Sequence, residues 1–423
     1  MEEEKQADQG TGSKAFRQFW MADVALKLGS GVWMLALPII AIEFLAGDSR
    51  HVGYLASAST VCYLLVGLPA GVWIDRMVKR RVMILSALIR AALLASVPLL
   101  WFAGLLSLPY MFVVALLVGV STLFYDIAYQ SYIPLLVGAN QSYSANARLE
   151  TTSRAVRAAG PAIVGAAMKI VSAPLLVLVD AIGYVVCALM LRRVPEVEQK
   201  RPAPAKRRLR EEILEGFKFI WNEQALRVIA YAVVLSNFFA TAISTLVPIL
   251  VLTQFNLGSA ALGMVYTAGE IGGLAGALML GTIRKRLGLG RVLAGGLIVA
   301  ATFTALVPLA ASMPSDRPIL AQTLLMISLF GSAIGGVTFA VSQVSLRQMI
   351  CPNEILSRVS ASMRFIIWGT MPFASISAGL CAYYFGVQPT LWLAVIGAIL
   401  TVLPIFAILR YVPAPAVPGA ADA

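Results

Sequence analysis

Ionisable side chains lie inside stretches of this sequence that are otherwise apolar. Glu270 lies in the middle of the run 259–283, on the helix face that also carries Tyr266 and Thr267. Arg284 follows 14 positions later, roughly 21 Å along a helix that rises ~1.5 Å per residue. A carboxyl group at that depth must be neutral, paired or hydrated, because an unpaired charge is costly at low dielectric constant. Glu270 is therefore a candidate to exchange a proton or to bind an organic cation. A buried acid held by static hydrogen bonds is the alternative.

Three further acids lie in other apolar runs. Asp23 and Lys27 are four positions apart and can form an ion pair on one helix face. We favour this structural pair over a role in binding a small molecule. Asp180 lies in the run 173–193 and is interpreted as structural.

Asp126 shares a helix face with Tyr129 and Gln130. We expect it to line a cavity or to bind Arg154 or Arg157 of the next run, and slightly favour the second. The candidates for carrying a proton or binding a small molecule are Glu270, Asp126, Asp23, Lys27, Glu150 and Arg154.

A polar stripe follows one face of the run 226–254. It consists of Asn237, Thr241, Ser244 and Thr245. Large apolar side chains occur nearby in this run and its counterparts, namely Trp33, Met34, Phe238, Phe239, Trp368 and Met371. An apolar cavity with a few polar anchors suits amphipathic organic molecules. The candidates for its lining are Tyr129, Gln130, Asn237, Thr241, Tyr266 and Trp368. Ordinary helix packing is the alternative for each.

These residues belong to twelve apolar runs, each about long enough to cross a bilayer as a helix. The runs lie near 16–46, 52–75, 82–104, 108–137, 143–171, 173–193, 226–254, 259–283, 290–311, 318–350, 354–385 and 388–411. The chain of 423 residues is 59% hydrophobic and only 13% charged, whereas a soluble domain carries about 25% charged residues. The runs do not alternate every second residue, as barrel strands would. The sequence predicts an all-α membrane protein with twelve transmembrane helices.

The two halves of the chain repeat each other. Gly53 and Gly263 are 210 positions apart, and seven further pairs share that separation. These are Pro38 with Pro248, Gly71 with Gly281, Arg76 with Arg286, Arg81 with Arg291, Pro98 with Pro308, Arg148 with Arg358 and Arg154 with Arg364. The repeat predicts two pseudo-symmetric six-helix bundles, an arrangement that secondary transporters use around a site at the membrane midplane.

Basic residues are concentrated in alternate loops. They follow the second and eighth runs and fill the segment between the sixth and seventh, which explains the net charge of +12 without nucleic acid. Basic loops remain in the cytoplasm, so both termini are expected there. The opening segment is polar and acidic, unlike a signal peptide. The four cysteines lack metal-ligand spacing, and no Walker sequence occurs, so we expect no metal, no cofactor and no ATPase.

A cluster of charge joins the second and third runs. It reads Gly71-Val-Trp-Ile-Asp75-Arg76-Met-Val-Lys79-Arg80-Arg81. The glycine permits close helix approach, and the carboxylate can cap a helix and bind arginine. We expect Gly71, Asp75, Arg76 and Arg81 to form a conformational switch; loop charge alone is the alternative. The stretch resembles the loop signature of the major facilitator superfamily, with Val78 in place of the usual glycine. That resemblance implies alternating access and small-molecule substrates.

The fifth run contains Gly160-Pro161 followed by Gly165, which resembles the helix-5 motif of exporters in that superfamily. A simple packing kink is the alternative. The segments 124–134, 146–150 and 215–221 are similar to a bacterial branch that includes macrolide-efflux and enterobactin-exporter proteins. Drug:proton exporters often carry arginine four residues before a helix-4 glycine. Ala115 stands at that spacing before Gly119, so coupling would use other carboxylates.

We therefore expect an exporter of hydrophobic or amphipathic small molecules, driven by proton antiport, and not an enzyme. The alternatives are a dedicated siderophore or metabolite exporter and a lipid flippase or scramblase. The expected setting is a monomer in the bilayer of a bacterial plasma (inner) membrane. The expected segments are a cytoplasmic tail 1–13, a bundle 14–193, a cytoplasmic linker 194–224 with an amphipathic helix, a bundle 225–411 and a disordered tail 412–423.

Overall fold

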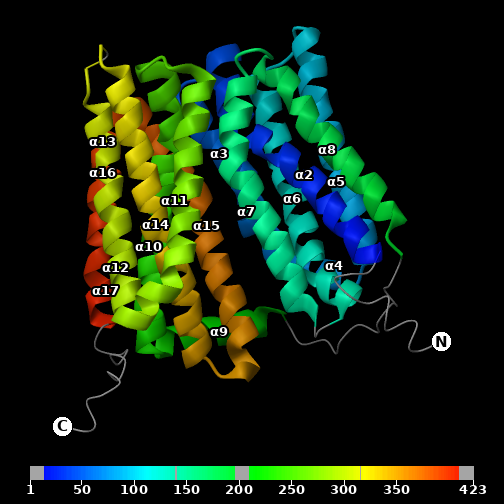
Figure 1. Cartoon of the computed structure of the whole chain (residues 1–423), viewed down its shortest axis with the longest axis vertical. Helices are drawn as coiled ribbons and strands as arrows, with labels where there is room; N and C mark the ends of the chain where they lie inside the picture. The colour runs from blue at the N-terminus through cyan, green and yellow to red at the C-terminus, as the bar shows by residue number, and fades with distance from the viewer. Residues whose placement is uncertain (1–13, 139–140, 196–208, 315, 409–423) are drawn as a thin grey trace. The chain divides into compact units, whose positions relative to one another are not determined.

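The computed structural model describes residues 14–138, 141–195, 209–314 and 316–408 (Figure 1). All regular secondary structure in these ranges is helical, which confirms the predicted all-α class. The tails predicted at 1–13 and 412–423 lie outside the described residues, as does 196–208 of the predicted linker.

The first half of the chain contains the helices that correspond to the first six apolar runs. They are α2 (Lys14–Ile39) with the π-helix η1 (Ile40–Phe44), α3 (Ser49–Leu65), α4 (Gly67–Asp75), α5 (Lys79–Phe102), α6 (Leu108–Val137), α7 (Ser142–Ala167) and α8 (Ala173–Arg193).

The second half begins with the amphipathic helix expected in the linker, α9 (Leu209–Asn222), and continues with the last six runs. They form α10 (Gln224–Ile249) with η3 (Leu250–Gln254), α11 (Gly258–Leu287), α12 (Leu289–Thr304), α13 (Leu306–Ala311), α14 (Pro318–Ile350), α15 (Asn353–Phe385), α16 (Val387–Leu400) and α17 (Val402–Ile408).

Ten helical segments of the described chain are long and apolar enough to cross a membrane. Two predicted spans do not meet both conditions by themselves. The second is divided at Val66 into α3 and α4. The fifth, α7, is 26 residues long but carries charged side chains in its first half, including Glu150, Arg154 and Arg157. Its ionic residues therefore distinguish α7 chemically from the other long helices.

The predicted repeat recurs in the backbone. Pro38 lies inside α2 and Pro248 inside α10, and a π-helical turn follows each of them at positions that are again 210 apart. A proline within a helix removes one N–H donor and displaces the preceding turn, and π-turns occur at such interruptions. After each π-turn one residue adopts a left-handed φ of 50°, Ala46 in the first copy and Asn256 in the second. A proline near the end of the helix is therefore followed by the same π-helical turn in both halves of the chain.

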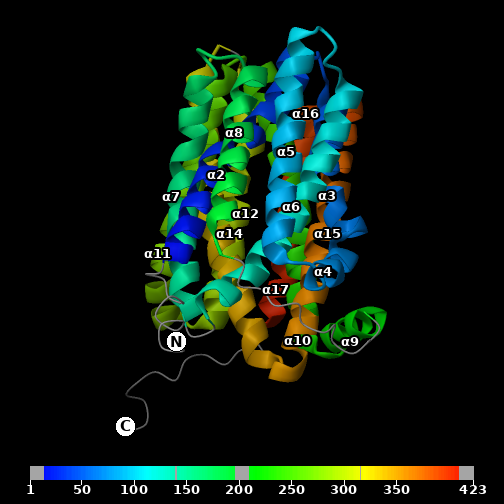
Figure 2. The ribbon, with the colours of Figure 1, turned by 90° about the vertical axis from the view of Figure 1, so that its right-hand side faces the viewer.

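The described helices form two compact units. The first comprises Met1–Lys206 and Leu257–Met264, and the second comprises Arg207–Asn256 and Val265–Ala423, within the limits of the described ranges. In the first unit, α2 packs along α8 and α7, and α5 packs between α6 and α8 (Figures 1 and 2). Gly29 allows a close approach of α2 to α8, because an added Cβ would lie 2.8 Å from the Asp180 Cα.

In the second unit, α12 packs against α14, and α10 packs against α15 and α16. Its core contains the fully buried side chains of Ile229, Leu293, Val359 and Ile405. The amphipathic helix α9 lies across the ends of α10 and α15 (Figure 2). One face of the amphipathic helix α9 therefore packs on the helices of this unit.

Candidate functional site

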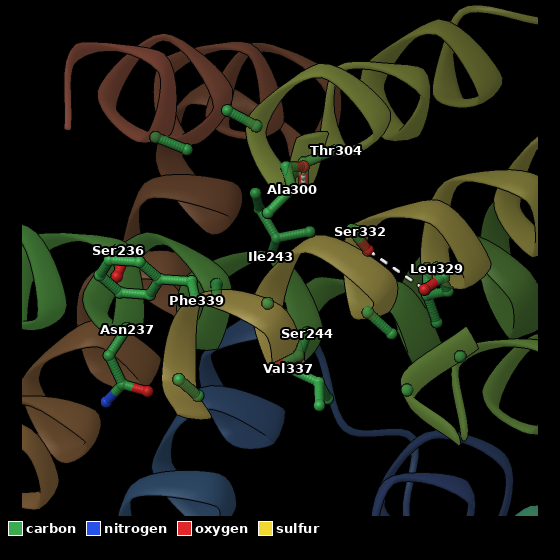
Figure 3. A pocket seen from close by; sticks show the side chains of 18 of the residues that line it. Ser236, Asn237, Ile243, Ser244, Ala300, Thr304, Leu329, Ser332, Val337 and Phe339 are labelled. Carbon is green, nitrogen blue, oxygen red and sulfur yellow. Dashed lines mark hydrogen bonds between the residues drawn. The ribbon is translucent and has the colours of Figure 1, made fainter. Parts of the chain in front are cut away.

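A cavity of about 590 Å³ lies within the second unit (Figure 3). Its walls come mainly from α10, α11, α12 and α14, with single contributions from α13, α15 and α16. Figure 3 shows Ile243 of α10 extending towards Ala300 of α12, with Leu329 and Phe339 of α14 on other parts of the wall. These apolar side chains make the greater part of the lining. The cavity therefore favours ligands with substantial apolar surface.

Neutral polar groups are distributed around this cavity. The hydroxyl groups of Ser244, Ser332 and Thr304 donate to carbonyl oxygens of their own helices, at 2.9, 3.2 and 2.7 Å respectively. A hydroxyl oxygen that donates in this way keeps lone pairs that can accept a further hydrogen bond. Asn237 Nδ2 donates to the Ile367 carbonyl oxygen at 3.0 Å and so joins α10 to α15. The polar stripe predicted on α10 thus contributes to both packing and the cavity.

Glu270 lines the cavity together with Tyr266, from the shared face of α11 that the sequence indicates. Among the described residues of the lining, it is the one whose side chain is a carboxylic acid or a base. Its carboxylate is therefore the strongest electrostatic feature of the cavity, and a cationic group would interact with it most favourably.

Gln343 of α14 was missed by the sequence analysis. It lines the cavity, is 6% exposed, and its Oε1 atom has no hydrogen-bond partner in the described part of the chain. A buried acceptor in this condition is costly unless a ligand or water satisfies it. The signal available in the sequence was a strongly polar side chain inside the apolar run 318–350.

The other predicted cavity residues lie elsewhere. Thr241 and Trp368 are in the second unit but do not line this cavity. Tyr129 and Gln130 belong to α6 of the first unit. Their predicted role in substrate binding stays a prediction.

The first unit contains the predicted pair of Asp23 and Lys27. Lys27 Nζ lies 2.7 Å from Asp23 Oδ2, and the Asp23 carboxylate is 2% exposed. The Lys27 ammonium also lies 5.7 Å from the centroid of the Tyr129 ring, which stacks on Phe19. The Tyr129 hydroxyl also interacts with the Asp23 carboxylate. The pair is therefore held by α6 as well as by its own helix.

The expected bond from Asp126 to an arginine of α7 is wrong. Asp126 Oδ2 instead accepts a hydrogen bond of 3.4 Å from Tyr63 Oη of α3. Arg154 and Arg157 bind Glu150 at 2.9 and 3.2 Å. Glu150 is one turn away from Arg154 on the same helix, which makes it the nearer partner.

The segment predicted to be a switch lies at the junction of α4 and α5. Arg76 and Arg81 are exposed, and the side chain of Asp75 lies outside the described residues. The close helix approach expected at Gly71 is not present, because an added Cβ would meet nothing within 4 Å. The neighbouring Arg80 instead binds the Val194 carbonyl oxygen at the end of α8.

The helix-5 motif has two different environments. Pro161 lies inside α7, and an added Cβ at Gly160 would meet nothing within 4 Å. At Gly165 an added Cβ would lie 2.6 Å from the Ser259 carbonyl oxygen, and Ser259 Oγ donates to the Gly165 carbonyl oxygen at 3.2 Å. Ser259 belongs to the segment Leu257–Met264, which groups with the first unit. Only Gly165 therefore serves close backbone packing.

Arg90 of α5 is a second residue that sequence reasoning missed. Its side chain is 9% exposed, its guanidinium binds Thr122, and its Nη2 lies 3.8 Å from Asp180 Oδ2. The guanidinium carbon lies 4.4 Å from the centroid of the Tyr184 ring. A lone arginine within the apolar run 82–104 was the available signal, because charged residues in spans are rare and usually paired.

Comparison with known proteins places these features in a family. Residues 24–334 match the model of the Major Facilitator Superfamily. The multidrug efflux pump Tap of Mycolicibacterium fortuitum is 26% identical over 375 residues, which cover 86% of this chain and 88% of that protein.

Solved structures share the fold at low identity. A variant of the nucleoside transporter NupG superposes with a TM-score of 0.78 at 12% identity, over 93% of this chain and 100% of that one. An inward-facing bacterial homologue of the iron transporter ferroportin gives 0.75 at 13% identity, over 93% and 98% of the two chains. At these identities the likeness concerns the fold alone.

Proposed function

Because this chain belongs to the major facilitator superfamily, we propose that it exports hydrophobic or amphipathic small molecules by alternating access, driven by proton antiport. The family and the fold are those of membrane transporters and not of enzymes. The direction of transport is inferred from the relative that is a multidrug efflux pump.

The cavity of the second unit carries this proposal. Its volume of about 590 Å³ lies within the ~300–1,000 Å³ of typical small-molecule sites. Its apolar walls would desolvate the hydrocarbon part of a ligand, while Asn237, Gln343 and the hydroxyl groups offer acceptors for a polar part. No single one of these groups demands a particular substrate. The lining thus favours a site that accepts several related amphipathic molecules.

Glu270 supplies the proposed link between substrate and proton. A carboxylate among apolar walls is stabilised either by a bound cation or by a proton, and the two compete for the same oxygen atoms. Protonation from outside would release a cationic substrate, and deprotonation to the cytoplasm would restore the site for the next one. Because the substrate and the proton compete for one carboxylate, the protein can exchange one for the other without a second coupling residue.

Transport in proteoliposomes tests the proposal. Ethidium is a suitable probe, because its permanent charge prevents passive trapping by a pH gradient. Vesicles with an acidic lumen should accumulate ethidium, and Glu270→Gln should abolish that accumulation while exchange of an uncharged amphiphile persists. Glu223→Gln is the matched control, because Glu223 precedes α10 and does not line the cavity. Wild-type transport that ignores the pH gradient would overturn proton antiport.

The alternatives make different predictions in the same vesicles. A dedicated exporter of one siderophore or metabolite should not show competition among unrelated amphiphiles. A flippase or scramblase should move labelled phospholipid between the leaflets. Competition by several unrelated amphipathic cations, without lipid movement, would favour the multidrug exporter.

A further inference from the structure

Five ionisable side chains are embedded between the helices of the first unit. They are Asp23 and Lys27 of α2, Arg90 of α5, Asp126 of α6 and Asp180 of α8. The groups that face them from the same and neighbouring helices are Tyr63, Thr122, Tyr125, Tyr129 and Tyr184, together with Cys187, which contacts Tyr125, and Glu150 near Asp23. The embedded set contains three acids and only two bases. One negative charge therefore lacks a cation within the set.

Lys27 is already committed to Asp23 at 2.7 Å. Arg90 is the cation whose charge acts on both Asp126 and Asp180, while the charge of Lys27 acts on Asp126 less strongly and not on Asp180. The guanidinium is bound to Thr122 and lies over the Tyr184 ring. One guanidinium between two carboxylates leaves an uncompensated charge at low dielectric constant, unless one carboxylate carries a proton.

Asp180 is the acid whose surroundings least support a charge. It is fully buried, and neither carboxylate oxygen has a hydrogen-bond partner in the described part of the chain. The distance of 3.8 Å to Arg90 Nη2 exceeds a hydrogen bond. The α2 backbone closes the other side, since the Cβ position above Gly29 lies 3.1 Å from Asp180 Oδ1. Asp126, in contrast, is only half-buried and accepts a hydrogen bond from Tyr63.

We propose that Arg90, Asp126 and Asp180 form a proton-binding site within the first unit, in which one guanidinium and one proton balance two carboxylates and the proton resides on Asp180. Loss of that proton would leave a carboxylate beside Arg90. The guanidinium would then shorten the contact from 3.8 Å to an ion pair. The protonation state of Asp180 thereby controls how α5 is bound to α8. The presence of this proton is inferred from the geometry alone. Its role in driving transport rests on the proposed proton antiport.

Infrared spectroscopy of the purified full-length protein tests the presence of the proton. The C=O stretch of a protonated carboxyl group is separate from the bands of carboxylates. The Glu270→Gln chain is the starting point, so that the cavity acid does not contribute. We expect a protonated-carboxyl band at neutral pH that Asp180→Asn removes and that Asp48→Asn, at the start of α3, leaves intact. A band that survives Asp180→Asn, or its absence from the starting chain, would overturn the proposal.

Arg90→Gln gives an independent test, which remains decisive if Asp180→Asn does not fold. The glutamine can still bind Thr122 but supplies no charge, so both acids should then be protonated and the band should grow about twofold. An unchanged band would contradict a shared guanidinium.

Whether the proton on Asp180 takes part in transport is tested separately, in proteoliposomes that contain the protein with intact Glu270. Asp180→Asn should shift or flatten the pH dependence of ethidium accumulation, and Asp48→Asn should not. A positive infrared result with an unchanged pH profile would overturn the coupling role of the site. A positive infrared result with gradient-independent wild-type transport would instead overturn the antiport proposal and leave the proton site standing.

Discussion

Ala46 and Asn256 share a left-handed φ of 50°, although they lie 210 positions apart in the two halves of the chain. Each follows the π-helical turn that ends the first long helix of its half. The conformation is costly for alanine, whereas asparagine tolerates it better and glycine adopts it freely. The repeat has therefore kept a backbone bend whose strain differs between the two copies.

This difference predicts unequal effects of the same substitution. Ala46→Gly should raise the free energy of unfolding by about 1 kcal/mol, because glycine removes the strain of the left-handed conformation. Asn256→Gly should change it by less. Thermal unfolding of both variants in one detergent provides the measurement. Equal shifts in the two variants would contradict a strained Ala46.

The docking of α9 predicts opposite effects for two glycine-to-alanine substitutions. Arg358 Nη1 donates to Glu215 Oε2 at 2.6 Å, and an added Cβ at the neighbouring Gly216 would lie 2.7 Å from the Arg358 carbonyl oxygen. Gly216→Ala should therefore destabilise the second unit, because backbone must move to accommodate the methyl group. Overpacking typically costs about 1–3 kcal/mol.

Gly281→Ala is its control, because a Cβ there would meet nothing within 4 Å. Alanine in an unobstructed helix should stabilise the chain by about 0.5–1 kcal/mol. Thermal unfolding of both variants gives the sign of each change in the free energy of unfolding. Stabilisation by both substitutions would show that α9 does not pack closely on α15.

The start of α3 is predicted to depend on acid. Burial is the largest influence on the Asp48 carboxyl and raises its pKa, but hydrogen bonds from Arg50 and from the His51 backbone N–H, with the nearby positive charges, outweigh it. The net pKa lies below the ordinary 3.8. A carboxyl with a lowered folded-state pKa stabilises above its unfolded-state value, and the contribution disappears as the pH falls through the folded-state value.

Hydrogen exchange at the Arg50 and His51 amides measures this loss, because both donate to Asp48 Oδ1. Protection should fall at acid pH in the wild type but not in Asp48→Asn, since asparagine also caps a helix and does not titrate. Asp316→Asn, in another loop, controls for a general effect of acid. The same acid response in wild type and Asp48→Asn would exclude this carboxyl as the cause.

Much of the fold could be predicted because apolar length and proline position act locally. Each of the twelve runs contains a helix or a broken helix, and the breaks in the first and seventh runs follow Pro38 and Pro248. Pairing across helices could not be predicted in the same way. Asp126 binds Tyr63 instead of an arginine of α7, because the partner depends on how α3 packs against α6.

The candidate site shows the same limit. Glu270 could be identified because a carboxylate in a span is rare. Gln343 and Arg90 required the structure, since only the packing of neighbouring helices shows that the first lacks a partner and that the second faces two acids. A polar residue in an apolar run is visible in a sequence, but whether its neighbours satisfy it is a property of the tertiary arrangement.

The basic loops predict the orientation in the membrane. Cysteines placed singly at positions 51, 205 and 315, in a chain whose four native cysteines are replaced, provide the probes. A membrane-impermeant thiol reagent added to intact cells should label positions 51 and 315 but not 205, because basic segments such as 194–224 remain in the cytoplasm. Labelling at 205 before lysis would reverse the proposed topology.

Gln343 predicts a ligand preference that is independent of the proton. Its buried Oε1 would accept a hydrogen bond from a protonated amine, and hydrogen bonds to charged groups contribute about 1.5–3 kcal/mol. Gln343→Leu keeps a side chain of similar volume and removes the acceptor. The variant should therefore bind an amphipathic amine at least about tenfold more weakly. Its affinity for tetraphenylphosphonium, which has no hydrogen-bond donor, should be nearly unchanged. Ser345→Ala on the same helix is the control, because Ser345 does not line the cavity. Fluorescence titration in nanodiscs gives both affinities. An equal loss for the two ligands would mean that Gln343 acts through packing and does not bind the substrate.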